Sequence, residues 1–279
     1  MRIDGFDLAA FVRATLAEDL GEGGDITSRA VIPAAARFRG VMGCRQRAVI
    51  AGLGIAEAFF RALDPEVAIE RLVEDGAAVA AGADLMRLEG SARAMLTAER
   101  SALNTVQHLS GIATMTRAYV EAIARTGATL LDTRKTIPGL RLLEKYAVRM
   151  GGGTNHRMRL DDAAMIKDNH IAVAGGIAEA VRAARDAGIA RIIVEVDRLD
   201  QIAPALAAGA THILCDNMDL ATLRAAVAEI AGRVPVEASG GVTLETIRAI
   251  SETGVDFISV GRLTQSAPAA DIGLDFSAL

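Results

Sequence analysis

Hydrophobic and polar positions follow a regular order along the second half of the chain. Short apolar runs typical of buried strands end at Thr133, Asp168, Glu195, Asp216, Ser239 and Gly261. Successive ends lie 35, 27, 21, 23 and 22 residues apart. Between them, apolar residues recur at helical spacing over 139–150, 176–187, 199–208, 219–230 and 243–252. Strand, helix and strand at this spacing predict right-handed βαβ units and a parallel sheet.

The number of successive units favours a closed α/β barrel over an open sheet. The first interval is long enough to contain a further short strand near 151–157. In an α/β barrel the reactive groups lie where strands end and the following loops begin, and the polar residues of this chain fall at those places. The sequence contains neither a Gly-x-Gly-x-x-Gly dinucleotide motif nor a P-loop.

The first part of the chain has a mixed pattern. Helical spacing of apolar residues predicts helices over 6–20, 54–63 and about 92–125, and β-type runs predict strands over 38–50 and 85–88. We expect a compact α/β region here, distinct from the repeated units that follow.

Composition and charge exclude several classes of function. Of the 279 residues, 51% are hydrophobic, which excludes a disordered chain, and no apolar stretch approaches the roughly 18 residues of a membrane span. Aromatic residues make up 3%, there is no Trp and the net charge is -5, so we expect no nucleic-acid partner. Cys44 and Cys215 lie far apart and outside any Cys-x-x-Cys motif, which fits a reducing cytoplasm.

Positive charge gathers at the predicted strand ends. Only three of the 30 basic residues are lysines, and Lys135 and Lys167 stand at strand ends. Lys145, inside the predicted helix 139–150, is expected on a solvated helix face. Arg134, His156 and Arg157 add to the cluster, as does Arg100 in the long helix. An acidic protein that focuses cations in one cleft is expected to bind a small, multiply anionic ligand.

A second group of residues predicts a phosphate site. Ser239, Gly240 and Gly241 follow one strand and precede a helix, and Gly261 ends the next strand. Exposed backbone N–H groups at such turns bind phosphate, and barrels commonly place this site after their last two strands.

Two carboxylates stand between the cations and the glycines. Glu195 and Asp216 are candidates to hold ribose hydroxyls, to hold Mg²⁺ or to stabilise a developing cation. The four histidines include no His-x-His or His-Glu-x-x-His pair, which argues against a zinc site. We expect His108, His170 and His212 to be structural.

Several long motifs resemble those of the quinolinate phosphoribosyltransferase family, also called nicotinate-nucleotide pyrophosphorylase (carboxylating). In the second part they are DTRKTIPGLR (132–141), EKYAVRMGGGTNHR (144–157), IKDNH (166–170), VEVD (194–197) and CDN (215–217). In the first part they are EDLGEGGDITS (18–28), AERSALN (98–104) and HLSGIAT (108–114). The resemblance covers nearly the whole chain, in the family's order.

The resemblance implies a fold and a reaction. An N-terminal α/β sandwich domain would span 1–112, joined by the tail 270–279, and a seven-stranded α/β barrel would span 113–269. The family converts quinolinate and phosphoribosyl pyrophosphate into nicotinate mononucleotide, pyrophosphate and CO₂, using Mg²⁺, in NAD biosynthesis. It also implies a homodimer in which Arg100 reaches the partner's site.

Site residues follow from the matched motifs. The implied quinolinate ligands are Arg100, Thr133, Arg134, Lys135, His156, Arg157 and Lys167. The implied phosphoribosyl pyrophosphate ligands are Glu195, Asp216, Ser239, Gly240, Gly241 and Gly261. Glu195 and Asp216 would also hold Mg²⁺, and the implied catalytic residues are Lys135, Lys167, Glu195 and Asp216. The sequence departs from the family at Gln265, where a His usually stands beside the phosphate loop.

Alternatives remain at this point. One is a paralogue associated with molybdenum uptake, which shares the fold and some motifs. Another is an aldolase-type barrel in which Lys135 or Lys167 forms a Schiff base, and a third is a non-catalytic anion-binding protein of the same fold. The sequence also leaves open whether Lys135 or Lys167 steers decarboxylation.

Overall fold

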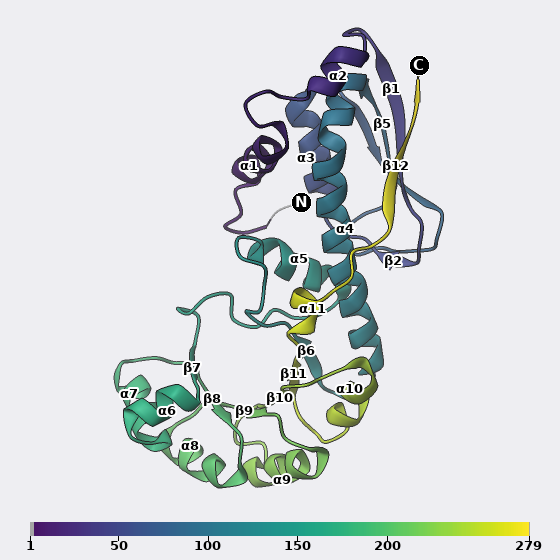
Figure 1. Ribbon diagram of the computed structural model, residues 1–279. Helices are drawn as coiled ribbons and strands as arrows, with labels where there is room; N and C mark the ends of the chain where they lie inside the picture. Colours follow the sequence, from purple (N-terminus) through teal and green to yellow (C-terminus); the bar gives the residue numbers. More distant parts are fainter. Residues whose placement is uncertain (1–2, 279) are drawn as a thin grey trace. The chain divides into compact units, whose positions relative to one another are not determined.

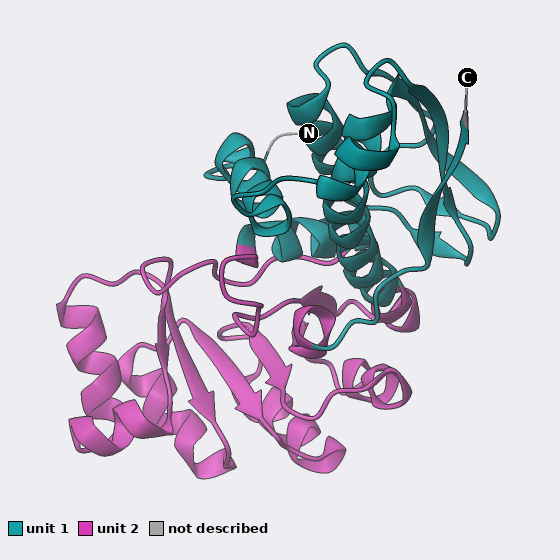
Figure 2. Ribbon diagram, turned by 45° about the horizontal axis from the view of Figure 1, so that its top comes forward, with its two compact units in different colours: residues 1–117, 142–152, 266–279 teal, residues 118–141, 153–265 magenta. Residues whose placement is uncertain are grey.

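The computed structural model describes residues 3–278, which divide into two compact units. Unit 1 comprises residues 1–117, 142–152 and 266–279, and unit 2 comprises residues 118–141 and 153–265 (Figure 2). None of the helices within the described residues has both the length and the apolar character needed to cross a membrane.

Unit 1 is built on a four-stranded antiparallel sheet with the order β12-β1-β5-β3. Its strands are β1 (Arg37–Cys44), β3 (Ala68–Arg71), β5 (Ala83–Ser91) and β12 (Ile272–Ala278). A second, two-stranded sheet joins β2 (Ala48–Val49) to β4 (Ala78–Val79). Because β12 comes from the C-terminal tail, the two ends of the chain contribute to one sheet.

Several helices lie wholly or largely in unit 1 beside this sheet. They are α1 (Leu8–Leu20), α2 (Ile26–Val31), α3 (Leu53–Leu63), α4 (Ala92–Ala122) and α5 (Arg141–Gly151). Figure 1 shows α3 and the first part of α4 along the sheet, and Phe59 and Phe60 of α3 are almost wholly buried. The Asp75 carboxylate caps α3 by accepting hydrogen bonds from the N–H groups of Gly52 and Leu53, at 3.0 and 3.1 Å.

Helix α5 contradicts one expectation from the sequence. Lys145 was expected on a solvated helix face, and this is wrong, because its side chain is wholly buried. The residues from Leu143 to Val148 are all buried, so this part of the helix has no solvated face. Glu144 is also wholly buried, and its carboxylate lies 2.9 Å from Nε2 of His108.

Unit 2 contains the predicted parallel sheet, with the order β6-β11-β10-β9-β8-β7. Its strands are β6 (Thr129–Leu131), β7 (Ala164–Ile166), β8 (Ile192–Val196), β9 (His212–Asp216), β10 (Val236–Ser239) and β11 (Phe257–Ser259). The central strands are buried on both faces, which explains their continuous apolar runs.

Helices alternate with these strands, and most of them lie along the outer face of the curved sheet (Figure 1). They are α6 (Asp168–Ala174), α7 (Ile177–Asp186), the 3₁₀ turn η1 (Leu199–Gln201), α8 (Ile202–Ala208), α9 (Leu220–Ile230), α10 (Leu244–Ser251) and α11 (Arg262–Gln265). The Asp219 side chain caps α9 by accepting a hydrogen bond from the Thr222 N–H at 2.7 Å.

The long first interval contains the extra strand position expected near 151–157. Thr154 forms an isolated parallel bridge with Leu131 of β6. Within residues 3–278, no strand ladder joins Thr154 to β7 at the other edge, so the hydrogen-bonded sheet has six strands. The mixed α/β class is therefore confirmed.

Several predicted boundaries differ from the structure. The run 38–50 forms two strands, because a turn at residues 45–47 separates β1 from β2. Strands β6, β7 and β11 each end two residues before the predicted position. In each of these three strands the hydrogen-bonded ladder ends before the polar residues that follow. Those polar residues therefore lie in the loops at the pocket.

Candidate active site

A pocket of about 640 Å³ opens within unit 2, at the carboxyl ends of the parallel strands. This volume is in the range of sites for small molecules. The pocket is lined by nearly all of the site residues predicted from the sequence, namely Thr133, Arg134, Lys135, His156, Arg157, Lys167, Glu195, Asp216, Ser239, Gly240, Gly241 and Gly261. Gln265 and Arg262 also line it. The strand ends therefore gather as expected of parallel strands.

Arg100 is the one predicted site residue that does not line this pocket. It lies on α4 in unit 1, where its guanidinium is 3.5 Å from Oδ1 of Asn104. Its role in a partner's site stays a prediction.

Two arginines face the pocket at one end, after β6 and before β7. Nε of Arg134 is buried and has no hydrogen-bond partner among the described residues. Arg157 donates from its guanidinium to the Ala163 carbonyl at 3.0 Å. Burial and the neighbouring Arg134 lower the pKa of Arg157. A buried donor without an acceptor is costly, and two adjacent guanidiniums repel, so an anionic ligand would relieve both.

Lys135 is held over the pocket by contacts to its backbone. Its N–H donates to the Thr133 hydroxyl at 3.0 Å, and the buried Thr264 hydroxyl donates to its carbonyl at 2.7 Å. A Cβ added at Gly261 would lie 2.8 Å from Cδ of Lys135. Gly261 therefore leaves room for the Lys135 side chain, a role separate from the predicted phosphate contact. Within the described residues the Lys135 ammonium forms no ion pair.

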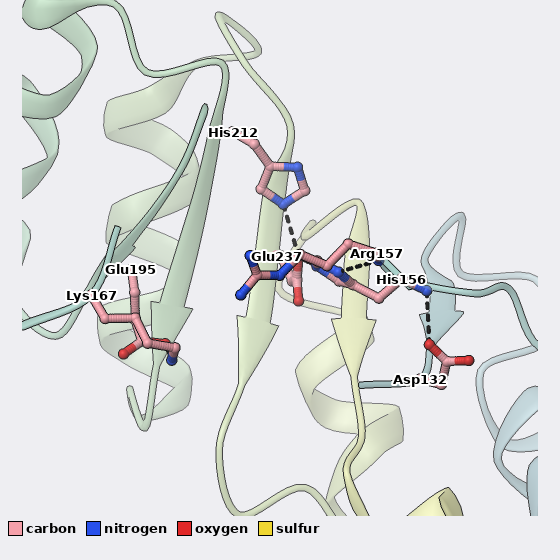
Figure 3. A network of polar contacts seen from close by, with 7 residues as sticks. All are labelled: Asp132, His156, Arg157, Lys167, Glu195, His212 and Glu237. Atoms are coloured by element: carbon pink, nitrogen blue, oxygen red, sulfur yellow. Dashed lines mark hydrogen bonds and ion pairs between the residues drawn. The ribbon is translucent and has the colours of Figure 1, made fainter. Parts of the chain in front are cut away.

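Lys167 and Glu195 form an ion pair across the ends of β7 and β8 (Figure 3). Ile166 lies opposite Val194 in the ladder, so the next residue of each strand brings these two side chains together. The Glu195 side chain is 17% exposed and the Lys167 side chain 43%. Lys167 is therefore already paired, whereas Lys135 is available to a ligand. We call Arg134, Lys135, Arg157 and Lys167 the cationic half of the pocket.

The end of β9 is locked to the glycine turn after β10. Asn217 donates from its side-chain amide to the Asp216 carboxylate at 2.6 Å, and its backbone N–H donates to the Ser239 carbonyl at 2.9 Å. Gly240 has φ +92°, and a Cβ there would lie 2.1 Å from Oδ1 of Asn217. Only glycine fits this position.

The glycine turn leads into helix α10. Gly241 also has a positive φ, of +62°, and Thr243 precedes the first turn of the helix. Backbone N–H groups at a helix N-terminus and at such a turn bind phosphate. We call Ser239, Gly240 and Gly241, with the first turn of α10, the glycine half of the pocket.

Beneath the cationic half lies a buried carboxylate that the sequence reasoning missed. Glu237, in the middle of β10, is wholly buried and lines the pocket. Its Oε2 is 3.2 Å from Nε2 of His156 and 3.0 Å from Nε2 of His212 (Figure 3). A signal was present, since Glu237 lies two residues before Ser239 and so points to the same face of the strand.

No group of three or more His, Cys, Asp or Glu side chains that could hold a metal ion occurs among the described residues. Glu195 and Asp216 are carboxylates on neighbouring strands at the pocket. Mg²⁺ often binds one or two carboxylates and takes its other ligands from substrate phosphates and water. The donor set therefore fits Mg²⁺ only together with a phosphate ligand.

Comparison with known proteins agrees with this geometry. The model of the quinolinate phosphoribosyl transferase C-terminal domain matches residues 112–275, and that of the N-terminal domain matches residues 25–110. The chain belongs to the quinolinate phosphoribosyltransferase family. The resemblance stated from the motifs is thereby confirmed.

Relatives in this family are similar along nearly the whole chain. The nicotinate-nucleotide pyrophosphorylase [carboxylating] of Mycobacterium leprae is 45% identical over 273 residues, which is 95% of this chain and 95% of the relative. A chloroplastic enzyme of the same name from Oryza sativa subsp. japonica is 41% identical and covers 96% of this chain and 77% of its own.

Solved structures of other proteins share the fold of the chain to different degrees. NadC from Streptococcus pyogenes has a TM-score of 0.95 and 38% identity, covering 100% of this chain and 99% of that one. Human nicotinic acid phosphoribosyltransferase has a TM-score of 0.64 at 14% identity, covering 98% of this chain and 74% of its own, so it shares the fold alone.

Proposed function

We propose that this protein is a decarboxylating quinolinate phosphoribosyltransferase of NAD biosynthesis. It converts quinolinate and phosphoribosyl pyrophosphate into nicotinate mononucleotide, pyrophosphate and CO₂. The observation that carries the proposal is the buried Nε of Arg134, which has no partner among the described residues and lies beside a second guanidinium, that of Arg157. These groups suit a dicarboxylate better than a neutral ligand.

The cationic half is the quinolinate subsite in this proposal. Arg134 and Arg157 bind the two ring carboxylates, because a guanidinium pairs with a carboxylate through two parallel N–H donors. Lys135 adds a third cation, since its ammonium forms no ion pair with any residue that the structure describes, whereas Lys167 is engaged by Glu195. We therefore favour Lys135 over Lys167 as the lysine next to the departing 2-carboxylate.

The glycine half and the two carboxylates form the phosphoribosyl pyrophosphate subsite. The N–H groups of Gly240 and Gly241 donate to the 5′-phosphate, and Ser239 adds a hydroxyl. Glu195 and Asp216 bind the ribose hydroxyls and would hold Mg²⁺, which neutralises pyrophosphate charge when bound.

The chemistry follows from fixed charge and positioning. The quinolinate nitrogen attacks the ribose carbon as pyrophosphate leaves, and Glu195 and Asp216 stabilise the positive charge that develops on the sugar. The ring nitrogen is then cationic, so it accepts the electron pair released when the 2-carboxylate departs as CO₂. A proton replaces that carboxylate on the ring carbon. No covalent protein intermediate is required.

Finer features of the assembly belong to the same proposal. We infer a seven-stranded barrel, because the Leu131–Thr154 bridge adds a seventh strand position to the sheet. We also infer a sandwich domain of 1–112 with the tail 270–279, a barrel domain of 113–269, and a homodimer in which Arg100 serves the partner's site. Free thiols at Cys44 and Cys215 support a cytoplasmic location.

The test is to incubate the protein with quinolinate, phosphoribosyl pyrophosphate and Mg²⁺ and to measure CO₂ and nicotinate mononucleotide. Equal amounts of the two products are expected, and Arg134→Ala should abolish both, which excludes a contaminating enzyme. Turnover with nicotinate but not with quinolinate would contradict the proposal. Borohydride trapping of a carbonyl substrate on Lys135 or Lys167 would instead support the aldolase alternative.

A further inference from the structure

A buried carboxylate lies beside the cationic half of the pocket, the part that we assign to an anionic ligand. Glu237 is wholly buried in β10, between Leu214 of β9 and Phe257 of β11. An ionised carboxylate in the interior of a parallel sheet is costly unless hydrogen bonds compensate. A carboxylate beneath bound quinolinate would also repel it. The position therefore calls for a specific role.

Two buried histidines lie close to one oxygen of this carboxylate. Oε2 of Glu237 is 3.2 Å from Nε2 of His156 and 3.0 Å from Nε2 of His212, and both rings are buried. Burial raises the pKa of Glu237, but the hydrogen bond with His156 and the close contact with His212 outweigh it and hold the pKa at about 2. Glu237 is therefore an anion at neutral pH and can only accept hydrogen bonds.

The contacts of His156 define which ring nitrogen carries a proton. Nδ1 of His156 accepts a hydrogen bond from the backbone N–H of Arg157 at 2.7 Å, so Nδ1 has no hydrogen. Nε2 faces an ionised carboxylate and must be the donor. The ring is thus in its neutral Nε2–H form, and both nitrogens are engaged within the protein.

This arrangement connects Glu237 to a guanidinium that faces the ligand. The same Arg157 residue donates from its backbone to His156 and from its side chain to the Ala163 carbonyl, at 2.7 and 3.0 Å. The His156 backbone N–H is itself fixed by the Asp132 carboxylate at 2.8 Å. Repulsion from Arg134 would otherwise displace Arg157, so a rigid backbone at this point keeps the two cations together.

We propose that Glu237 is a positioning residue of the quinolinate subsite: it fixes His156 as the neutral Nε2–H tautomer, and His156 in turn fixes the backbone that directs Arg157 into the pocket. His156 accordingly contributes no charge to the ligand. The proposal rests on the proposed function for its kinetic consequence, but the tautomer is a property of the protein without substrate.

The first test is histidine ¹⁵N NMR of the substrate-free protein at neutral pH. The chain has only four histidines, and His156→Gln identifies the resonance of interest. The expected spectrum shows a proton on Nε2 of His156 and none on Nδ1. A proton on Nδ1, or on both nitrogens, would overturn the proposal whether or not the protein turns over quinolinate.

The second test is the isosteric substitution Glu237→Gln, which replaces the ionised acceptor of the His156 Nε2–H by a neutral amide. We expect a less firmly held His156 ring, measured as a changed ¹⁵N shift of Nε2, and a rise of about tenfold in KM for quinolinate, as for one lost charged hydrogen bond. The kcat value and KM for phosphoribosyl pyrophosphate should change less than about threefold. An unchanged KM for quinolinate in a folded variant would overturn the proposal.

A matched control is available in unit 1. Glu144 is also a wholly buried carboxylate bonded to Nε2 of a histidine, His108, at 2.9 Å, and it does not line the pocket. Glu144→Gln should leave KM for quinolinate unchanged. Equal KM increases in both variants would assign the effect to general loss of stability and contradict a positioning role. If Glu237→Gln does not fold, the ¹⁵N spectrum of the unaltered protein still tests whether His156 is the neutral Nε2–H tautomer.

Discussion

The cationic half and the glycine half of the pocket differ in what they present to an anion. The cationic half uses long side chains, and its Arg134 and Arg157 are partly buried. Burial first, and then repulsion by Arg134, lower the pKa of Arg157. The glycine half uses backbone N–H groups, made accessible by the positive φ of Gly240 and Gly241. Both lie on one rim of unit 2, a few strands apart in the same sheet.

The difference indicates how the two ligands are distinguished. Guanidinium groups match the planar geometry of carboxylates, whereas a ring of N–H donors at a helix start matches a tetrahedral phosphate. Supporting contacts differ accordingly: Glu237 and His156 lie beneath the cationic half, and Asn217 braces the glycine half. Substitutions in one half should therefore affect one substrate more than the other.

The largest expected effect comes from removing the Arg134 side chain, whose Nε is buried without a hydrogen-bond partner among the described residues. Arg134→Ala should weaken quinolinate binding by about 3–5 kcal/mol, as two charged hydrogen bonds are lost. Affinity for phosphoribosyl pyrophosphate should stay nearly constant. Titration calorimetry with each substrate measures both, and Arg159→Ala, which removes an exposed arginine paired with Asp161, serves as the control. Equal losses for the two substrates would remove the distinction between the halves.

The support beneath the cationic half should appear in the pH dependence of stability. The pKa of Glu237 is lowered from 4.5 to about 2, so its stabilising contribution is present above pH 4.5 and is lost as the pH falls toward 2. The contribution is about 3 kcal/mol. Urea unfolding of Glu237→Gln should show a correspondingly smaller decline between pH 5 and pH 2, and identical slopes would contradict the buried anion.

A smaller effect on quinolinate binding is expected for Arg100, which does not line the pocket of its own chain. Arg100→Ala should weaken quinolinate binding by about 1.5–3 kcal/mol, the range for a hydrogen bond to a charged group. If Arg100 acts in the partner's site, mixing Arg100→Ala with Arg134→Ala should restore part of the activity, because hybrid dimers contain one intact site. Absence of rescue in verified hybrid dimers would assign Arg100 to its own chain or to no site.

The smallest effect in this series concerns the glycine half. Gly240→Ala should raise KM for phosphoribosyl pyrophosphate and lower the free energy of unfolding by about 1–2 kcal/mol, because a left-handed backbone is unfavourable for alanine. Gly188→Ala is the matched control, with φ +77° but nothing within 4 Å of the added Cβ. It should lose less stability, because only the left-handed backbone opposes its Cβ, whereas the Cβ at position 240 also meets Asn217; neither KM should change. If Gly240→Ala changed only the KM for quinolinate, the assignment of the glycine half to phosphoribosyl pyrophosphate would be contradicted.

The sequence predicted the periodic part of the fold and most of the pocket for a shared reason. In βαβ units, the spacing of apolar residues along the chain indicates where strands and helices lie. Polar residues such as Lys167 and Asp216 interrupt the apolar runs at the strand ends, where the pocket forms. The tail residues 272–278 give no such signal of their own, because β12 is defined by pairing with the distant β1.

The features that the sequence did not predict depend on contacts between distant residues and not on the spacing of apolar residues along the chain. Glu237 stands inside a strand, and its partners His156 and His212 are 81 and 25 residues away in sequence, so only folding reveals the network. Lys145 was placed on the wrong face for a similar reason. A helical pattern indicates which residues share a face, but it does not show how much of the helix other elements cover.

The most direct test of the two-half pocket is a pair of crystal structures, one with quinolinate and one with phosphoribosyl pyrophosphate. We predict quinolinate carboxylate oxygens within about 3 Å of Nε of Arg134 and of the Arg157 guanidinium, and the 5′-phosphate within about 3 Å of the N–H groups of Gly240 and Gly241. Quinolinate bound at the glycine turn, with Nε of Arg134 still lacking an acceptor, would contradict the account.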